Sequence, residues 1–198
     1  MPSPFPRRCR LVALLCVALL CAARPATGRA QSRPTDTTQL GPRFFSADEA
    51  ESTAVALFAA GRGAEARRIV AVSTAHRWLG SPYGWGAVGT RGAIDCSALV
   101  RAAYLRAGIT LPRVSRDQAA LGVAVVRRVD ALALADLLVF GKASTGAITH
   151  VGLYLGGGWF VHSASATGGV TVSRLADPQW THLWLGARRI IAEDAPTR

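Results

Sequence analysis

Cysteine is nearly absent from this chain beyond its first residues. Of four cysteines, Cys9, Cys16 and Cys21 lie near the start and only Cys96 follows them. Disulfide-framed secreted domains carry paired cysteines along their length, so this sequence excludes that class of fold. Cys96 is therefore an intermolecular link, a free reactive thiol or a small buried hydrophobic residue.

Lysine and runs of basic residues are also scarce. A single lysine stands beside 22 arginines, and no basic cluster alternates with aromatic residues. Nucleic-acid-binding proteins gather basic residues on one stripe or patch, so we expect no nucleic-acid partner. The formal net charge of +11 suits an anionic polymer or an envelope surface. With 50% hydrophobic and 18% charged residues, the 198-residue chain is typical of one globular domain with a substantial core.

Long apolar runs are limited to residues 11–23, an uncharged stretch too short to cross a bilayer comfortably. Three arginines between positions 7 and 10 precede it, and small residues follow it. This layout is typical of a secretory signal peptide, which we predict over residues 1–30 with cleavage before Gln31. Cleavage after Ala23 and retention of the segment as a signal anchor are the alternatives.

Removal of residues 1–30 changes the charge and the cysteine content. It takes five of the 23 basic residues and none of the 12 acidic ones, so the formal charge falls from +11 to +6. Cys96 becomes the one remaining thiol. We expect the mature protein to be secreted or periplasmic, in the cell envelope, with no stable membrane span.

The remainder of the chain divides at a glycine-rich break. Residues 31–63 are predicted to be a linker followed by a short helix, in which Ser46 and Glu49 have the spacing of a capping box. Residues 64–194 are predicted to be the main domain, beginning with a helix to about Leu79.

A further helix is predicted to begin at Cys96. Asp95 is a good N-cap residue and Gly108 a good stop, with apolar residues between them at helical spacing. The start of a helix carries partial positive charge, which favours an ionised thiol. We therefore expect Cys96 to be reactive already at pH 6.

The sequence pattern changes after Gly108. Short apolar runs alternate with glycine or polar breaks, which predicts strands over residues 123–129, 137–140, 150–155, 159–163, 170–174 and 183–191. Helices followed by strands indicate an α+β domain in which the N-terminal helices pack on an antiparallel sheet.

Two of these strands carry histidines. If the glycines at positions 156–158 form the loop, Leu155 pairs with Trp159 and Leu153 with Val161. One face of the hairpin is then apolar, and the other carries His150 and His162 as diagonal neighbours about 7–8 Å apart. A shift of one residue would move His162 to the apolar face, so the pattern favours the register that brings the two histidines together.

A thiol and two histidines suit nucleophilic catalysis. Cys96 would attack, one histidine would act as base and the other would orient it; the pattern alone does not decide which is which. The histidines could also be strand residues without a role or metal ligands. We predict no metal, because no third ligand lies at suitable spacing.

These residues fall within an ordered set of motifs that resembles the NlpC/P60 peptidases over about residues 66–190. The set is Tyr83-Gly84-Trp85-Gly86, Asp95-Cys96-Ser97, Leu111-Pro112-Arg113-Val114-Ser115 with Gln118, Asp136-Leu137, the run from His150 to Gly156, and Val161-His162-Ser163. Each piece alone is weak, whereas the order is highly specific.

The resemblance implies a papain-like α+β fold and a bacterial cysteine endopeptidase that cleaves peptidoglycan stem peptides without a cofactor, at the bond between D-isoglutamate and the diamino acid. It implies a triad of Cys96, His150 as base and His162 as orienter. It also suggests Tyr83 beside the nucleophile, with Asp95 and Ser97 near the substrate's amino end. A silent wall-binding module and an amidase or acyltransferase on the same scaffold are the alternatives.

Four positions depart from the usual pattern of that family. Glycine is usual where this chain has Ala87, Ala98 and Ala135, and phenylalanine is usual where it has Ile94. All four exchanges are small or apolar, so they bear on substrate fit more than on catalysis.

Overall fold

The computed structural model describes residues 46–194. The predicted signal peptide and the first part of the predicted linker lie outside the described residues. The described residues all belong to one compact unit. Within the described part, no helix has both the length and the apolar character needed to cross a bilayer.

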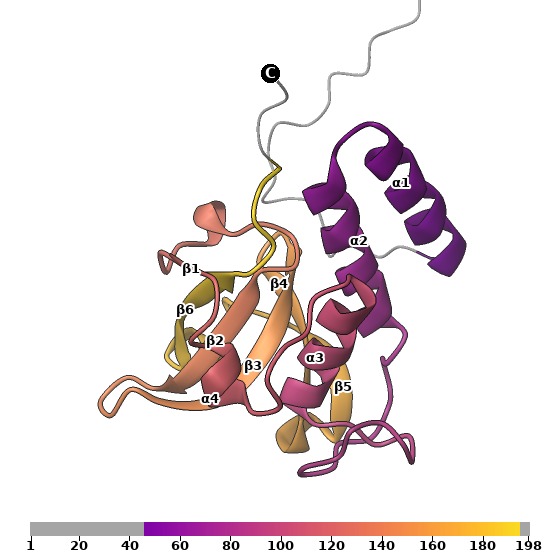
Figure 1. Ribbon diagram of the computed structural model, residues 1–198. Helices are drawn as coiled ribbons and strands as arrows, with labels where there is room; N and C mark the ends of the chain where they lie inside the picture. Colours follow the sequence, from indigo (N-terminus) through magenta and orange to yellow (C-terminus); the bar gives the residue numbers. More distant parts are fainter. Residues whose placement is uncertain (1–45, 195–198) are drawn as a thin grey trace, which may run out of the picture. The chain divides into compact units, whose positions relative to one another are not determined.

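The first half of the described chain is helical (Figure 1). The helices are α1 (Ala47–Ala59), α2 (Gly63–His76), α3 (Cys96–Arg106) and the short α4 (Ser115–Gln118), with α5 (Pro178–Thr181) near the end. The predicted capping box is confirmed, because the Ser46 side chain accepts from the Glu49 backbone and the Glu49 side chain from that of Ser46. α1 and α2 pack together through a small apolar cluster, whose members include Ala50, Leu57 and Ile69.

The second half forms one antiparallel sheet of six strands. In spatial order these are β1 (Val123–Val125), β6 (Trp184–Arg189), β2 (Leu137–Lys142), β3 (Ala147–Gly156), β4 (Trp159–Ala164) and β5 (Gly169–Arg174). The predicted α+β class is confirmed. The predicted strand at 123–129 is shorter than expected: β1 ends at Val125, and Val129–Ala131 form a 3-10 helix.

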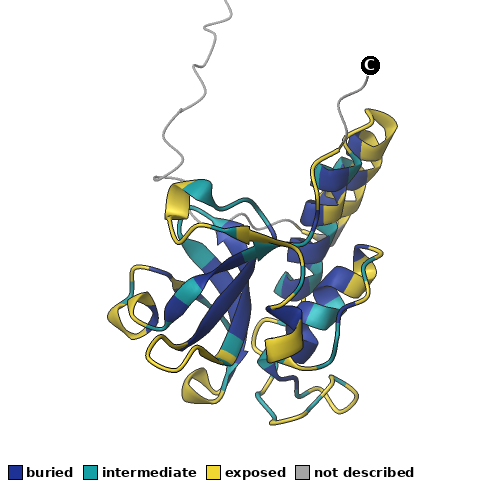
Figure 2. Cartoon of the chain, turned by 60° about the vertical axis from the view of Figure 1, so that its left-hand side comes forward, coloured by how far each residue is buried: buried dark blue, intermediate teal, exposed yellow. Residues whose placement is uncertain are grey.

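Both faces of the sheet are covered, because alternate residues of each strand enter different apolar clusters. Val151, Leu153 and Val161 face α3, where they meet Leu99 and Tyr104 in the larger cluster. The other cluster contains Phe140, Tyr154, Phe160, Trp180 and Trp184. Figure 2 shows much of the central strands buried. His162 on β4 is fully buried, whereas His150 lies at the less buried part of β3.

The histidine hairpin keeps its predicted register except at the turn. Leu153 pairs with Val161 as expected, but Trp159 pairs with Gly156 and not with Leu155. The turn has two residues, Gly157 and Gly158, with φ of 59° and 82°, which is the mirror-image turn that glycine favours. Gly156, at φ 93°, absorbs the extra position as a bulge. The bulge lies at the turn, so the faces of the residues beyond it are those predicted.

Candidate active site

Cys96 is the first residue of α3, as predicted. The Asp95 carboxylate caps this helix by accepting from the Ala98 N–H at 2.8 Å. The thiol is half-buried and is the one free cysteine among residues 46–194. Its position at a capped helix start leaves the first backbone N–H groups without helical partners, so they are able to bind a negative oxygen.

Asp95 and Ser97, on either side of the nucleophile, are both bound by Arg113. The Arg113 guanidinium donates to the two Asp95 oxygens at 2.6 and 3.2 Å and to the Ser97 hydroxyl at 2.9 Å. The Asp95 and Ser97 side chains are buried. Arg113 therefore fixes the segment that carries Cys96, and the Asp95 charge already has a partner.

The two histidines meet beside Phe140, Phe160 and Trp180, and His150 is the neighbour of Val151, whose backbone hydrogen-bonds the Cys96 thiol. His150 Nε2 lies 3.2 Å from His162 Nδ1, and His162 Nε2 lies 2.9 Å from the Ser173 hydroxyl. The predicted placement of both histidines on one hairpin face is thereby confirmed. Because Nε2 of His150 is taken by His162, its other nitrogen, Nδ1, remains to exchange a proton with a nucleophile.

Two neighbours of the histidines were not foreseen from the sequence. Ser173 belongs to β5, and Trp180 to the short α5. The Trp180 ring stacks on His150 with a centroid distance of 5.4 Å and meets His162 edge-on at 4.6 Å. No motif marks either residue, since each reaches the histidines only through the tertiary fold. Trp180 and Phe160 remove water from the imidazoles.

This burial decides the charge state of the site. Desolvation lowers the pKa of His150 to about 4, and desolvation together with the neighbouring His150 lowers that of His162 to about 3. Burial also raises the pKa of the Cys96 thiol, although backbone N–H groups, that of Val151 first, act against the rise. This direction is opposite to the lowered pKa that the helix start predicts for Cys96, because desolvation outweighs the helix start. Burial thus favours the neutral form of each imidazole and of the thiol.

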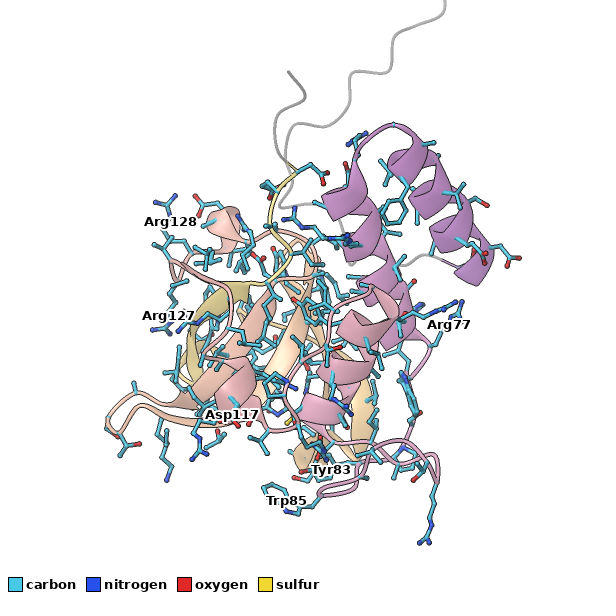
Figure 3. All side chains as sticks on the ribbon, viewed as in Figure 1. Arg77, Tyr83, Trp85, Asp117, Arg127 and Arg128 are labelled. Carbon is cyan, nitrogen blue, oxygen red and sulfur yellow. The ribbon has the colours of Figure 1, made fainter. Side chains whose placement is uncertain are left out.

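Tyr83 is the remaining residue suggested by sequence. Burial raises the pKa of the Tyr83 hydroxyl, and the charges of Cys96 and Asp95 act in the same direction. Its backbone N–H donates to Gly168 at 3.0 Å, so the loop is tied to the sheet next to β5. Figure 3 shows Tyr83 and the strongly exposed Trp85 at the same end of the domain. Within residues 46–194, no three potential metal ligands gather.

Gly152 makes a testable contribution to this geometry. A Cβ at this position would lie 2.8 Å from Phe160 Cδ2 and 3.3 Å from His162 Cβ. We expect Gly152→Ala to lower the free energy of unfolding by about 1–3 kcal/mol and to displace His162, with loss of activity. Thermal unfolding and iodoacetamide labelling of Cys96 check this.

Gly63→Ala is the matched control for Gly152→Ala, because its Cβ would make only ordinary contacts, at 3.4 Å or more. It should leave stability and labelling close to the unmodified protein. Equal behaviour of the two variants would show that the close approach of β3 to β4 does not hold the histidines.

Comparison with known proteins identifies similar chains. The family model "NlpC/P60 family" matches residues 80–189. The chain is 36% identical over 126 residues to "Probable endopeptidase YafL" of Escherichia coli, covering 63% of this chain and 51% of the relative. It is 36% identical over 122 residues to "Gamma-D-glutamyl-L-lysine dipeptidyl-peptidase" of Bacillus cereus, covering 61% and 35%. The chain thus spans about half or less of the length of these curated relatives.

Solved structures give the same picture. An NlpC/P60 family protein from Bacillus cereus is similar with a TM-score of 0.58 and 32% identity, over 63% of this chain and 40% of that one. The peptidoglycan hydrolase RipB from Mycobacterium tuberculosis is similar with a TM-score of 0.56 and 25% identity, over 74% and 87%.

Proposed function

This chain belongs to the NlpC/P60 family, and we propose that it is an exported cysteine endopeptidase that hydrolyses peptidoglycan stem peptides. The observation that carries the proposal is the 3.2 Å contact of His150 Nε2 with His162 Nδ1, on the strands packed against the helix that begins at Cys96. A base oriented by a second imidazole is what a thiol nucleophile requires.

The proposed reaction begins with a neutral thiol. His150 Nδ1 takes the Cys96 proton as the sulfur attacks the peptide carbonyl, and the backbone N–H of Cys96 contributes to the site that holds the oxyanion. His150 then gives the proton to the leaving amine, which leaves a thioester on Cys96. A water molecule, deprotonated by His150, attacks the thioester carbonyl; the carbon–sulfur bond breaks, the acid product leaves, and the Cys96 sulfur takes the proton back from His150. Tyr83 lies beside the reacting sulfur, and Asp95 and Ser97, held by Arg113, line the amino-terminal side of the substrate.

The proposed scissile bond joins D-isoglutamate to the diamino acid. In its support, a similar protein is named a gamma-D-glutamyl-L-lysine dipeptidyl-peptidase, whereas another, 37% identical, is named a murein DD-endopeptidase. Stem peptides with free and with blocked amino termini, digested and analysed by mass spectrometry, distinguish these bonds. Release of L-alanyl-D-isoglutamate supports the proposal. Cleavage between cross-linked stems, release of the intact peptide by an amidase, or binding without any product would each contradict it.

The pH dependence of hydrolysis should be unusually broad. The competent thiol–imidazole pair carries one proton, so activity is lost when His150 gains a second proton or when Cys96 loses its own. Because burial lowers the His150 pKa to about 4 and raises that of Cys96, both limits move outward. We expect kcat/KM to stay level through neutral pH, with the acid limb near pH 4 and the alkaline limb above the ordinary range of a thiol.

The profile is measured with a soluble stem peptide, after a check that the protein remains folded at each pH. An acid limb near pH 6.5, the ordinary pKa of histidine, would show that the His150 imidazole is solvated and that Trp180 does not shield it from water.

We also propose that residues 1–30 are a cleaved signal peptide, residues 31–63 a linker with a short helix, and residues 64–194 the catalytic domain. N-terminal sequencing of the exported protein should then begin at Gln31. A chain in the membrane fraction that still begins at Met1 would indicate a signal anchor.

A further inference from the structure

Ser173 ends the chain of hydrogen bonds that starts at His150. Its hydroxyl lies 2.9 Å from His162 Nε2, and its side chain is buried. Ser173 lies on the edge strand β5, directly opposite Phe160 in the register of β4 and β5. In the described part of the chain, the hydrogen bond of the Ser173 hydroxyl to the proposed triad is the one to His162.

The proton positions along this chain are linked. A neutral imidazole has one donor and one acceptor nitrogen. The tautomer of one histidine therefore decides the direction of both hydrogen bonds in the chain. Two arrangements exist. In the first, His150 Nε2–H donates to His162 Nδ1, and His162 Nε2–H donates to Ser173. In the second, the Ser173 hydroxyl donates to His162 Nε2, and His162 Nδ1–H donates to His150 Nε2.

Only the first arrangement leaves His150 able to accept a proton. When Nε2 of His150 carries hydrogen, Nδ1 has a free lone pair for the thiol proton. In the second arrangement Nδ1 carries the hydrogen, and His150 is not a base toward Cys96. The first arrangement also serves the imidazolium formed during the reaction, since His150 then donates through Nε2 without any proton having moved along the chain.

From this geometry we propose that Ser173 is a positioning residue. Its hydroxyl oxygen accepts a hydrogen bond from His162 Nε2–H and thereby fixes both histidines in the tautomer that makes His150 a base. The effect of Ser173 on catalysis rests on the proposed function, whereas its effect on the tautomers of the two histidines is independent of that function. Removal of the hydroxyl leaves a buried Nε2–H without an acceptor, which makes the first arrangement costly and shifts His162 toward the other tautomer.

Ser173→Ala and Ser173→Thr separate this role from a structural one. Threonine keeps the acceptor and suits a strand, whereas alanine removes it. We expect kcat of Ser173→Ala to fall about tenfold or more with KM within about twofold, and Ser173→Thr to stay within about threefold of the unmodified protein. Thr171→Val is the matched control. Thr171 lies on the same strand and pairs with His162, and its side-chain hydroxyl makes no hydrogen bond in the described structure.

Two measurements need no substrate. Nitrogen-15 NMR at pH 7 should show hydrogen on Nε2 of both His150 and His162 in the unmodified protein, and hydrogen on Nδ1 of His162 in Ser173→Ala. The rate of Cys96 alkylation by iodoacetamide at pH 7 should fall in Ser173→Ala and not in Thr171→Val.

An Nδ1–H tautomer of His162 in the unmodified protein would overturn the proposal even if Ser173→Ala did not fold. So would unchanged tautomers and alkylation in a folded Ser173→Ala protein. If peptidoglycan peptides are not cleaved at all while the tautomers and alkylation behave as expected, the proposed function fails and the role of Ser173 stands.

Discussion

Cys96→Ala is expected to remove peptidoglycan hydrolysis entirely, a loss of about 10⁴-fold or more, while the protein remains folded. The loss is large because the reaction is proposed to pass through a thioester, and alanine has no atom to form it. Stability should change by no more than about 1 kcal/mol, because the thiol is half-buried and the change leaves little empty volume. Mass spectrometry of the products and thermal unfolding measure the two effects.

Cys96→Ser is the companion variant, because it keeps the shape of the side chain and replaces sulfur by a poorer nucleophile. Both variants should still bind stem peptides, since the Arg113, Asp95 and Ser97 contacts are intact. Substantial turnover by a folded Cys96→Ala protein would contradict the proposed cysteine peptidase mechanism. Loss of binding together with loss of turnover would indicate structural damage beyond the nucleophile.

His150→Ala should lower kcat by about 10³-fold or more, with a smaller loss of about 10–100-fold for His162→Gln. His150 is proposed to move the proton at every step, whereas His162 orients it through the 3.2 Å contact. A glutamine amide retains one hydrogen-bonding atom near His150, so part of the orientation survives. Steady-state kinetics on a soluble stem peptide give both values.

His182→Gln is the control for these variants, because His182 is exposed at the end of α5 and makes no side-chain hydrogen bond in the described part of the chain. It should have normal kinetics. An inactive His162→Gln protein beside an active His150→Ala protein would reverse the roles assigned to the two histidines.

The sequence predicted well wherever one local rule decides the outcome. Aspartate is a favourable N-cap residue, so Asp95 predicted that Cys96 lies in the first turn of α3. Alternation of apolar residues placed His150 and His162 on one face, and that face survived an error of one residue at the turn. The error arose because three consecutive glycines do not indicate which of them is the bulge.

The parts that could not be predicted depend on the tertiary fold. Ser173 and Trp180 come to the histidines from β5 and α5, and no spacing in the sequence links them to His150. The sign of the Cys96 pKa shift also escaped prediction, because the helix start is visible in the sequence and the extent of burial is not. Arg113 was part of the family-like motif, but its two bonds to Asp95 depend on how the loop folds back.

The order of the site along the chain has a consequence for biosynthesis. Cys96 begins a helix in the first part of the described domain, whereas His150, Ser173 and Trp180 belong to the sheet and its last connections. A polypeptide leaves the ribosome from its N-terminus, so the thiol emerges well before the imidazoles that would activate it. A growing chain therefore carries the thiol without its proposed general base until the sheet and α5 have formed. Recovery of hydrolysis after dilution from denaturant should coincide with the final step of refolding.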